Sequence, residues 1–394
     1  MSAVAISRHW DEGGRLLAAV DHGPMPRFSR RELLAEIEAS GLAGRGGAGF
    51  PTAVKLNAVA RAPGRVVVAN GTEGEPASAK DKVLLEANPH LVLDGAVIAA
   101  AIVGASEAVV AIGRADRRVL KRLLHAVAKR SDHIDVRIET VPDRFVAGEE
   151  SALVHSLEGG PAKPTLRKPY ERGILVQNVE TLANVGLIAR YGAGWFRERG
   201  TPEEPGTALV TVLGAVRRPG VVEVELGTPF RDVLQRVGGL TALPQALLVG
   251  GYFGTWVRAN DAIDLPLANA ALKPLGAALG ARTIVVLPHD ACGLSESARV
   301  ARYLATESAG QCGPCVFGLP AMADALERTD VGRLRRLAPQ VAGRGACAHP
   351  TGATRFVASA VDVFADEIER HRRGRCRGAN HPPLLPVGAS PDWR

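Results

Sequence analysis

The chain contains few aromatic side chains: Phe, Tyr and Trp together make up 4% of its 394 residues. Recognition of nucleic acids by base stacking depends on such rings, so their scarcity argues against nucleic-acid binding despite a net charge of +7. Much of the positive charge lies in residues 370–377, Arg-His-Arg-Arg-Gly-Arg-Cys-Arg. We interpret this run as a solvated segment, with contact to an acidic partner or a membrane surface as the alternative.

The chain also lacks a long uncharged hydrophobic run. Its most apolar stretch, residues 91–112, is interrupted by Asp94 and Glu107. This stretch predicts a buried helix followed by a buried strand rather than a membrane span. Polar residues at positions 9, 11 and 12 leave no apolar core for a secretory signal peptide, so we expect a cytoplasmic protein.

Cysteine is scarce as well, with five residues in the chain. In a chain without an export signal, they favour metal or redox use over structural disulfides. Cys312 and Cys315 form a C-x-x-C pair, and Cys347 follows in Gly-Arg-Gly-Ala-Cys-Ala-His. By themselves these residues indicate a metal site of undefined type.

Hydrophobic periodicity predicts several domains, which the length of the chain can accommodate. Helices alternate with strands at 66–69, 107–112 and 134–140, which predicts an α/β domain with a largely parallel sheet. From about residue 205, a hairpin, a helix and a further strand predict a small β-grasp-like domain, and residues 295–371 have a helical pattern. We expect an N-terminal extension (1–29), the α/β domain (30–200), the β-grasp domain (205–290), a helical domain (291–376) and a disordered Pro-rich tail (377–394).

A Gly-rich segment at residues 41–52 reads Gly-Leu-Ala-Gly-Arg-Gly-Gly-Ala-Gly-Phe-Pro-Thr. Its glycines free the backbone to present N–H groups to an anion, and the helix expected to follow adds its dipole. No clear strand directly precedes it, which departs from the dinucleotide-binding fingerprint. Phosphate binding and an ordinary turn are both open on this segment alone.

Three further polar segments could contribute to a binding site. Residues 70–82 follow a predicted strand and hold two carboxylates two positions apart, which can bind hydroxyls, amides or a cation. Residues 148–153, Gly-Glu-Glu-Ser-Ala-Leu, place paired glutamates at a helix start, where the helix dipole also favours them. Residues 163–170 form a basic loop bounded by prolines, which could neutralise phosphate.

In their order along the chain, these motifs resemble the NADH-binding flavoprotein subunit of bacterial respiratory complex I and its relatives in soluble hydrogenases and formate dehydrogenases. The resemblance covers about residues 30–370. It implies a Rossmann-like domain for FMN and NADH, a β-grasp ligand-binding domain and a helical bundle holding a [4Fe–4S] cluster. The matching motifs are Gly-Arg-Gly-Gly-Ala-Gly-Phe-Pro-Thr (44–52), Glu-x-Glu-Pro (73–76), Gly-Glu-Glu-Ser-Ala-Leu (148–153), Ser-Leu-Glu-Gly (156–159), Asn-Val-Glu-Thr-Leu (178–182) and Glu-Ser-x-Gly-x-Cys-x-Pro-Cys (307–315).

The resemblance implies specific cofactor contacts. A loop shared by flavin and NADH, with Phe50 on the NADH side, comprises Gly44, Arg45, Gly46, Gly47, Ala48, Gly49 and Phe50. Flavin contacts are implied for Asn70, Glu73, Gly148, Glu149, Asn178 and Thr181, and nucleotide contacts for Glu75 and Glu150. Departures from the family occur at Thr72, where an aspartate is usual, at Arg167, where a lysine is usual, and after Lys55, where Ala58 replaces an aromatic residue.

The resemblance also makes Cys312, Cys315 and Cys347 three of the four expected cluster ligands, with Ala309 in place of the first. A thiolate from Cys292, an imidazole from His349 or a solvent oxygen could complete the site. A three-iron form, a Cys3His zinc site and loss of the cluster are the alternatives. We interpret Cys376 as an incidental thiol.

The implied function is transfer of a hydride from NADH to FMN and of single electrons to the cluster and an iron–sulfur or ferredoxin-like partner. Since the departures at Ala58 and Arg167 affect the nucleotide side, flavin binding is the firmer expectation. One alternative is an FMN protein that serves a ferredoxin or membrane reductase without using NADH; another is a non-catalytic β-grasp scaffold. A peripheral position at the inner face of the cell membrane is the alternative to a free cytoplasmic one.

Overall fold

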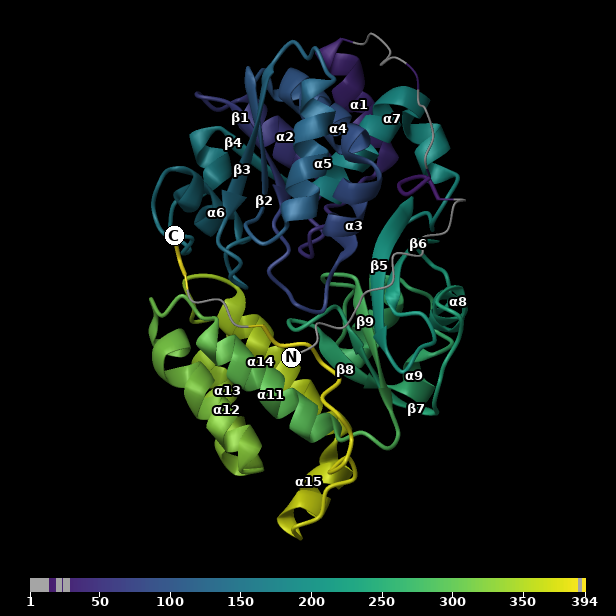
Figure 1. Cartoon of the computed structure of the whole chain (residues 1–394), viewed down its shortest axis with the longest axis vertical. Coiled ribbons are helices and arrows are strands. Elements are labelled where there is room, and N and C mark those ends of the chain that lie inside the picture. Colours follow the sequence, from purple (N-terminus) through teal and green to yellow (C-terminus); the bar gives the residue numbers. More distant parts are fainter. Residues whose placement is uncertain (1–13, 19–22, 24–28, 389–391) are drawn as a thin grey trace.

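The computed structural model of the chain describes residues 14–18, 23, 29–388 and 392–394. In Figure 1 an α/β domain occupies the upper half, a second sheet lies below it on the right, and a helical region lies below it on the left. The expected fold class, an α/β domain with a parallel sheet followed by a β-grasp-type domain and a helical region, is confirmed.

The first domain contains a four-stranded parallel sheet in the order β3-β2-β1-β4. Hydrophobic periodicity did not predict α3 or β4, both of which are short. The elements are α1 (Arg30–Ser40), α2 (Thr52–Ala60), β1 (Val66–Gly71), α3 (Lys80–Ala87), α4 (Pro89–Val103), β2 (Glu107–Gly113), α5 (Arg117–Ala128), β3 (Asp135–Val141), α6 (Glu150–Leu157), the 3-10 helix η1 (Pro169–Arg172), β4 (Ile174–Asn178) and α7 (Val179–Arg197).

Both faces of this sheet are covered. In β1, Val67 and Ala69 join the large core formed with α1 to α5 and α7, whereas Val68 between them joins a smaller core with α6. Successive side chains of a strand point to opposite faces, so a continuous apolar run is required where both faces are buried. This explains why Val66-Val67-Val68-Ala69 carries no polar residue.

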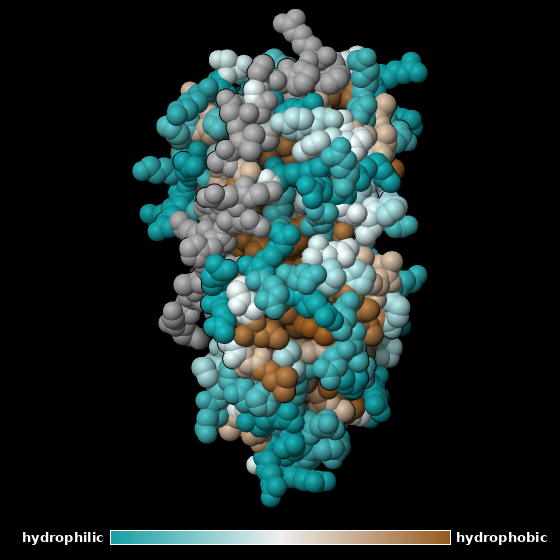
Figure 2. All heavy atoms as spheres, turned by 90° about the vertical axis from the view of Figure 1, so that its right-hand side faces the viewer, coloured by the Kyte–Doolittle hydropathy of each residue, from teal (hydrophilic) through white to brown (hydrophobic). Residues whose placement is uncertain are grey.

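The apolar stretch 91–112 is α4 followed by β2, as predicted. Helices α4 and α7 cross so closely that a Cβ on Gly95 would lie 1.7 Å from the carbonyl oxygen of Leu182. Among the described residues no single helix is long and apolar enough to cross a bilayer. Helices α3 and α4, which are bent by 98° relative to each other, meet the length and composition requirements only when they are taken as one segment. Figure 2 shows a largely hydrophilic face with hydrophobic residues gathered across its middle.

The second domain is a five-stranded mixed sheet in the order β6-β5-β9-β7-β8, in which only β5 and β9 are parallel. One face packs on α8 and the loops of this domain, and the other packs on the helical region through residues such as Leu248, Val285 and Trp256. The elements are β5 (Thr207–Gly214), β6 (Gly220–Glu225), α8 (Phe230–Arg236), β7 (Pro244–Val249), β8 (Thr255–Arg258), α9 (Ala259–Ala262), α10 (Asn269–Leu272), η2 (Lys273–Leu275) and β9 (Thr283–Pro288).

The helical region confirms the pattern predicted for residues 295–371. It shares one hydrophobic core with the second sheet, in which the Trp256 and Phe356 rings lie 6.4 Å apart between centroids. Its elements are α11 (Gly293–Thr306), the π-helical turn η3 (Pro314–Gly318), α12 (Leu319–Glu327), α13 (Val331–Val341), α14 (His349–Val363) and α15 (Ala365–Arg372).

The segment that follows α15 is packed against the protein. Leu385 is 1% exposed, and its N–H donates to a carboxylate oxygen of Glu296 at 2.8 Å. The hydroxyl of Tyr252 donates to the carbonyl of Pro386. Composition predicted a disordered tail because prolines prevent regular structure, but they do not prevent an extended chain from burying Leu385. The prediction is therefore wrong for residues 384–386.

Residues 14–18 of the N-terminal extension lie against β6. The backbone N–H groups of Arg15, Leu16 and Leu17 donate to the carboxylate of Glu223 at 2.9, 2.8 and 3.2 Å. These bonds satisfy a carboxylate that is 3% exposed. Most of the predicted extension lies outside the described residues.

Candidate functional site

The strand order of the first domain places a topological switch point between the carboxyl ends of β1 and β4; we call the region outside these two strand ends the crevice. From β1 the chain moves outward to β2 and β3, then crosses back to place β4 on the other side of β1. In open parallel sheets ligands bind at such a reversal, because the loops leave the two strands in opposite directions. Asn70, the penultimate residue of β1, and Asn178, the last residue of β4, are paired in register there.

The Gly-rich loop closes over this crevice. The N–H of Gly44 donates to the carbonyl of Phe50 at 2.8 Å, which makes the intervening residues a tight turn. Gly47 has a φ of +114°, a conformation that side chains rarely adopt. A Cβ on Gly46 would lie 3.1 Å from the Cβ of Asn178, so the loop backbone sits directly against the start of α7.

The Arg45 side chain points away from the crevice and into the junction between the first two domains. It is 2% exposed, and its Nη2 donates to the carbonyl of Pro205 at 2.9 Å. Burial, and then the nearby Arg282, lower the pKa of Arg45 to about 9. The backbone N–H of Arg45 donates to the Oγ1 of Thr181 at 2.7 Å, and Arg282 donates to the Arg45 carbonyl at 2.7 Å. Arg45 and Thr181 therefore hold the loop in place.

The loops after β1 and β3 are joined by a hydrogen bond and pack closely against each other. The side-chain amide of Asn70 donates to the carbonyl of Gly148 at 2.9 Å, and its oxygen accepts the N–H of Thr72 at 3.1 Å. A Cβ on Gly148 would lie 2.6 Å from the Oγ1 of Thr72. Only glycine allows the two loops to approach this closely.

Two of the predicted site carboxylates cap helices. Glu73 accepts the backbone N–H groups of Asp81 at 3.4 Å and Lys82 at 3.3 Å, at the start of α3. Glu149 accepts two backbone N–H groups at the start of α6, both at 3.0 Å. These groups lack partners within the helix, so the carboxylates satisfy donors that would otherwise be orphaned. Capping, one of the two interpretations of the glutamate pair, is thus observed for Glu149.

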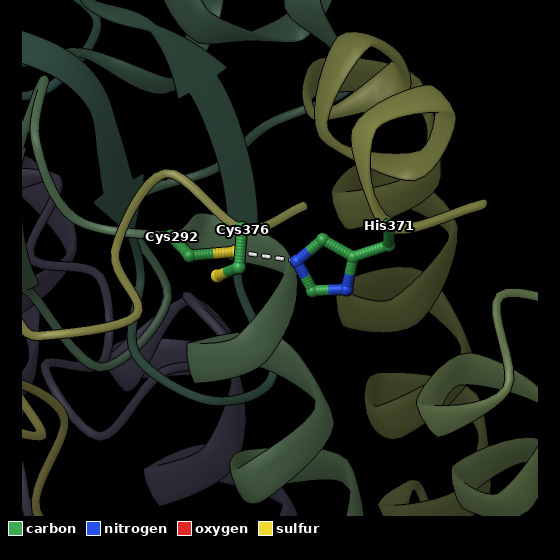
Figure 3. Close-up of side chains that lie close together, drawn as sticks. All are labelled: Cys292, His371 and Cys376. Atoms are coloured by element: carbon green, nitrogen blue, oxygen red, sulfur yellow. Dashed lines mark hydrogen bonds between the residues drawn. The ribbon is translucent and has the colours of Figure 1, made fainter. Parts of the chain in front are cut away.

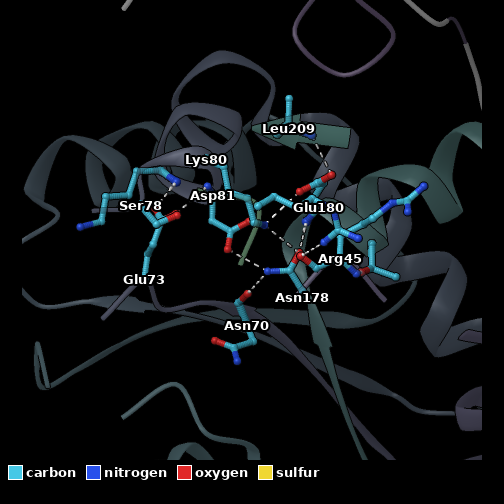
Figure 4. A network of polar contacts seen from close by, with 12 residues as sticks. Arg45, Asn70, Glu73, Ser78, Lys80, Asp81, Asn178, Glu180 and Leu209 are labelled. Carbon is cyan, nitrogen blue, oxygen red and sulfur yellow. Dashed lines mark hydrogen bonds and ion pairs between the residues drawn. The ribbon is translucent and has the colours of Figure 1, made fainter. Parts of the chain in front are cut away.

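A buried charged network lies beneath the crevice (Figure 4). The ammonium of Lys80 contacts Asp81 at 2.7 Å and Glu180 at 2.9 Å, and the amide of Asn178 donates to Asp81 at 2.8 Å. Glu180 also accepts the N–H of Leu209 at 3.0 Å. Burial opposes ionisation of Glu180, but Lys80 and two arginines lower its pKa. Lys80, Asp81 and Glu180 were not predicted as site residues; their positions inside the motifs at 70–82 and 178–182 were the signal that could have identified them.

The residues predicted for the nucleotide side come from three elements. Lys55 of α2 forms an ion pair with Glu150 of α6. The ring of Phe50 is 52% exposed beside the start of α2, and Ala58 is exposed further along that helix. Arg167 lies exposed in the loop before η1. Lys55 and Glu150 are thus brought together, while Arg167 faces solvent.

Glu75 lies where the first domain meets the second. Its Oε2 accepts the N–H of Tyr252 at 3.2 Å, whereas its Oε1 is buried and has no hydrogen-bond partner among the described residues. A Cβ on Gly251 would lie 2.2 Å from this Oε1, so the carboxyl group is pressed against the backbone of the β7–β8 turn. Burial, opposed by the Tyr252 hydrogen bond and assisted by the charge of Glu73, raises the pKa of Glu75 to about 8.

This raised pKa predicts a pH-dependent stability that Glu75→Gln should remove. The unfolded carboxyl loses its proton near its usual value of 4.5, but the folded one does so only near 8. Folding stability is therefore lost as the pH rises from about 4.5 to about 8. In urea unfolding of the cofactor-free protein, we expect Glu75→Gln to be more stable than the parent by about 1 kcal/mol or more at alkaline pH and equal near pH 4.5. An equal difference at both pH values would contradict this origin.

The three predicted cluster thiols gather beside η3 and the start of α14. Burial opposes ionisation of Cys312, but the backbone N–H groups of Ala346 and Cys315 lower its pKa. Burial, and then the neighbouring Cys312, raise the pKa of Cys315 to about 12. Burial also raises that of Cys347, which lies close enough to respond to the charge of Cys312. Ala309, at the place of the missing ligand, is 6% exposed.

Cys292 does not lie with these thiols. It caps the start of α11, whereas Ala309 follows the end of that helix. A helix of 14 residues spans about 21 Å, so the suggestion of Cys292 as fourth ligand is wrong. His349 follows Cys347 by two residues, and its Nε2 donates to the carbonyl of Leu304 at 2.8 Å. Its Nδ1 is buried, finds no hydrogen-bond partner in the part of the chain that the structure describes, and keeps its lone pair.

The loop after β3 joins the crevice to the thiols. Arg144 forms an ion pair with Glu307 at 3.3 Å, and the N–H of Phe145 donates to the same carboxylate at 3.0 Å. The rings of Phe145 and His349 lie 5.7 Å apart between centroids. The same loop ends in Gly148 and Glu149, and Glu149 lies near enough to Cys347 for its negative charge to contribute to the raised pKa of that thiol. One short segment therefore touches both candidate sites.

Comparison with known families divides the chain in the same way. Residues 37–187 match the Nuo51 FMN-binding domain, residues 209–251 match the SLBB domain, and residues 295–371 match the NADH-ubiquinone oxidoreductase-F iron-sulfur binding region. The crevice lies in the first match, and all three thiols lie in the last.

Individual relatives cover most of the chain. It is 31% identical to the NADH-quinone oxidoreductase F subunit of Streptomyces coelicolor over 87% of this chain and 84% of the relative. It is 29% identical to the HndC subunit of the NADP-reducing hydrogenase of Solidesulfovibrio fructosivorans over 86% of this chain and 76% of that relative. Among solved structures, an air-oxidised NAD+-reducing [NiFe]-hydrogenase superposes with a TM-score of 0.80 at 31% identity. That match covers 86% of this chain and 62% of the hydrogenase chain.

Proposed function

The chain belongs to the family of NADH-quinone oxidoreductase F subunits, and on this premise we propose that it passes electrons from NADH through FMN to an iron–sulfur cluster and on to a partner protein. The observation that carries the proposal is the loop after β3. Its Gly148 and Glu149 border the crevice, while its Arg144 and Phe145 contact the residues beside the thiols. Donor and acceptor sites are therefore neighbours within one chain.

The residues of the crevice fit FMN. Glycines at 44, 46, 47 and 148 let the loops that border the crevice pack closely, and Asn70 and Asn178 place amides near the ends of the two strands. When bound, the flavin accepts a hydride and releases electrons singly. The protein's part is to hold the ring system and exclude water. We assign this to the Gly-rich loop, Asn70, Gly148 and Asn178, with Thr72, Glu73, Glu149 and Thr181 fixing their positions.

For NADH we assign the outer edge of the same crevice. Phe50 offers an exposed ring there, which can stack on the nucleotide although Ala58 cannot. Lys55 and Glu150 form an ion pair at this edge, and Arg167 supplies an exposed positive charge. Glu75, protonated below about pH 8, can donate a hydrogen bond to a carboxamide.

Cys312, Cys315 and Cys347 fit a cluster that needs a fourth donor from outside the thiols. His349 Nδ1 has the free lone pair for this position, and solvent is the other source. We assign the onward partner, an iron–sulfur or ferredoxin-like protein, to the surface formed by Val316 and Phe317. These residues follow Cys315 directly and are 45% and 75% exposed. Apolar side chains of this size favour a protein interface.

Anaerobic titration of the FMN-loaded protein with NADH tests the proposal. We expect the flavin absorbance to bleach and the cluster absorbance to decrease with it. Ala58 favours a second candidate, an FMN protein that receives electrons from a ferredoxin or membrane reductase. In that case reduced ferredoxin bleaches the flavin and NADH does not. A colourless protein that cannot be loaded with FMN would reject both and leave the scaffold as the remaining alternative.

A further inference from the structure

A second cluster of metal-binding side chains lies at the opposite end of α11 from the three thiols. Cys292, His371 and Cys376 place their ligand atoms within 4.8 Å of one another, the one such group among the described residues. The Nε2 of His371 lies 3.3 Å from the sulfur of Cys292 (Figure 3). Their positions in the sequence, 79 and 5 residues apart, show that packing rather than a local motif assembles them. The interpretation of Cys376 as an incidental thiol does not fit this arrangement.

We propose that Cys292, His371 and Cys376 bind a zinc ion. Two cysteines and one histidine are ligands that Zn²⁺ takes in proteins, at about 2.3 Å for sulfur and about 2.0–2.1 Å for nitrogen. Tetrahedral coordination at these lengths sets neighbouring ligand atoms about 3.5–3.8 Å apart. The observed spacing brackets that range, so a small side-chain movement completes the site. A water molecule or small ligand takes the fourth position, because His371 and Cys376 are only partly buried.

The surroundings hold the three ligands in place. The N–H and the hydroxyl of Ser295 donate to the sulfur of Cys292 at 3.4 and 3.3 Å, and these two hydrogen bonds orient the sulfur. The chain then passes directly over Cys292: a Cβ on Gly378 would lie 2.4 Å from the Cys292 backbone nitrogen. Glycine two residues after Cys376 thus permits the close approach that brings the two sulfurs together.

The charge balance suits a dication with two thiolates. Such a site carries no net formal charge, so the arginines of residues 370–377 do not repel it. Arg377 is itself paired with the buried carboxylate of Glu367 at 2.9 Å. Bound zinc would tie the end of α15 and the chain beyond it to the start of α11, next to the second sheet.

Metal analysis of the full-length protein after addition of Zn²⁺ and gel filtration tests the proposal. We expect about one zinc per chain, retained by Cys312→Ala, in which the other thiol site is disabled. His371→Ala and Cys376→Ser should weaken zinc binding about tenfold or more. His371→Cys should restore it, because a thiolate replaces the imidazole. His381→Ala, which removes a partly exposed histidine of the same segment, is the matched control and should keep the metal.

Co²⁺ supplies a spectroscopic check on the iron-free Cys312→Ala protein. Thiolate-to-cobalt charge-transfer bands should appear, and Cys376→Ser should weaken them. Two results would overturn the proposal: zinc content that is unaffected by His371→Ala and Cys376→Ser, or a Cys292–Cys376 disulfide in protein purified under reducing conditions. A variant that no longer folds would show an altered circular dichroism spectrum. In that case the zinc content of His371→Cys, which keeps a ligand at this position, tests the proposal.

Discussion

Replacement of Cys312 by alanine should remove nearly all cluster iron and acid-labile sulfide from the protein. Cys312 is one of three thiols grouped beside η3, and with Ala309 already in place of a ligand, the substitution leaves only two. The thiol is partly exposed and its loss leaves no large cavity, so the fold should persist. We expect NADH still to bleach the flavin, whereas reduction of a ferredoxin-type acceptor should fall by about 100-fold or more. Iron and sulfide assays with steady-state kinetics measure both effects.

Cys376→Ser is the matched control for this prediction, because Cys376 belongs to the separate group with Cys292 and His371. It should leave the iron content unchanged. Ala309→Cys is the opposite test, since it restores a fourth thiol at a position that is 6% exposed. This variant should hold iron more firmly against a chelator. Full iron content in Cys312→Ala would reject the ligand assignment.

Gly148→Ala should weaken FMN binding by roughly 5- to 150-fold. The added Cβ would lie 2.6 Å from the Oγ1 of Thr72 and 3.1 Å from its carbonyl oxygen. Relieving such overpacking displaces the loops after β1 and β3, at a cost of about 1–3 kcal/mol, and the stated range is that cost expressed as a dissociation constant. Because Asn70 is held by the carbonyl of Gly148, the displacement reaches the end of β1. Quenching of flavin fluorescence during titration of the cofactor-free protein measures the affinity.

Gly194→Ala serves as the control, because a Cβ there meets no atom within 4 Å and the residue is exposed in α7. Its FMN affinity should equal that of the parent. Thermal unfolding of both variants separates a local effect from a general loss of stability. An unchanged dissociation constant for Gly148→Ala would show that the close contact between the two loops is not part of the flavin site.

Much of the domain organisation follows from the sequence because it depends on local patterns. The unbroken apolar run in β1 predicts a strand buried on both faces, and the Gly-rich loop predicts a tight turn before α2. Cys312 and Cys315 are brought close together by their spacing in the chain. These features depend on residues a few positions apart, so local patterns are enough to predict them.

Tertiary structure decided how individual side chains are used. Arg45 lies in a motif that suggests anion binding, yet its guanidinium is buried against Pro205. Glu149 caps α6, and Leu385 is buried in a segment whose composition suggested disorder.

The contrast between what the sequence and what the tertiary structure determined is largest for the cysteines. The sequence by itself indicated a metal site at Cys312 and Cys315, and its family resemblance implied Cys347 as a further ligand and a missing one at Ala309. It did not show that Cys292 lies beside His371 and Cys376, at the other end of α11, a helix about 21 Å long. Spacing in sequence constrains residues within a turn or two, whereas the meeting of residues about 80 positions apart depends on how whole helices pack.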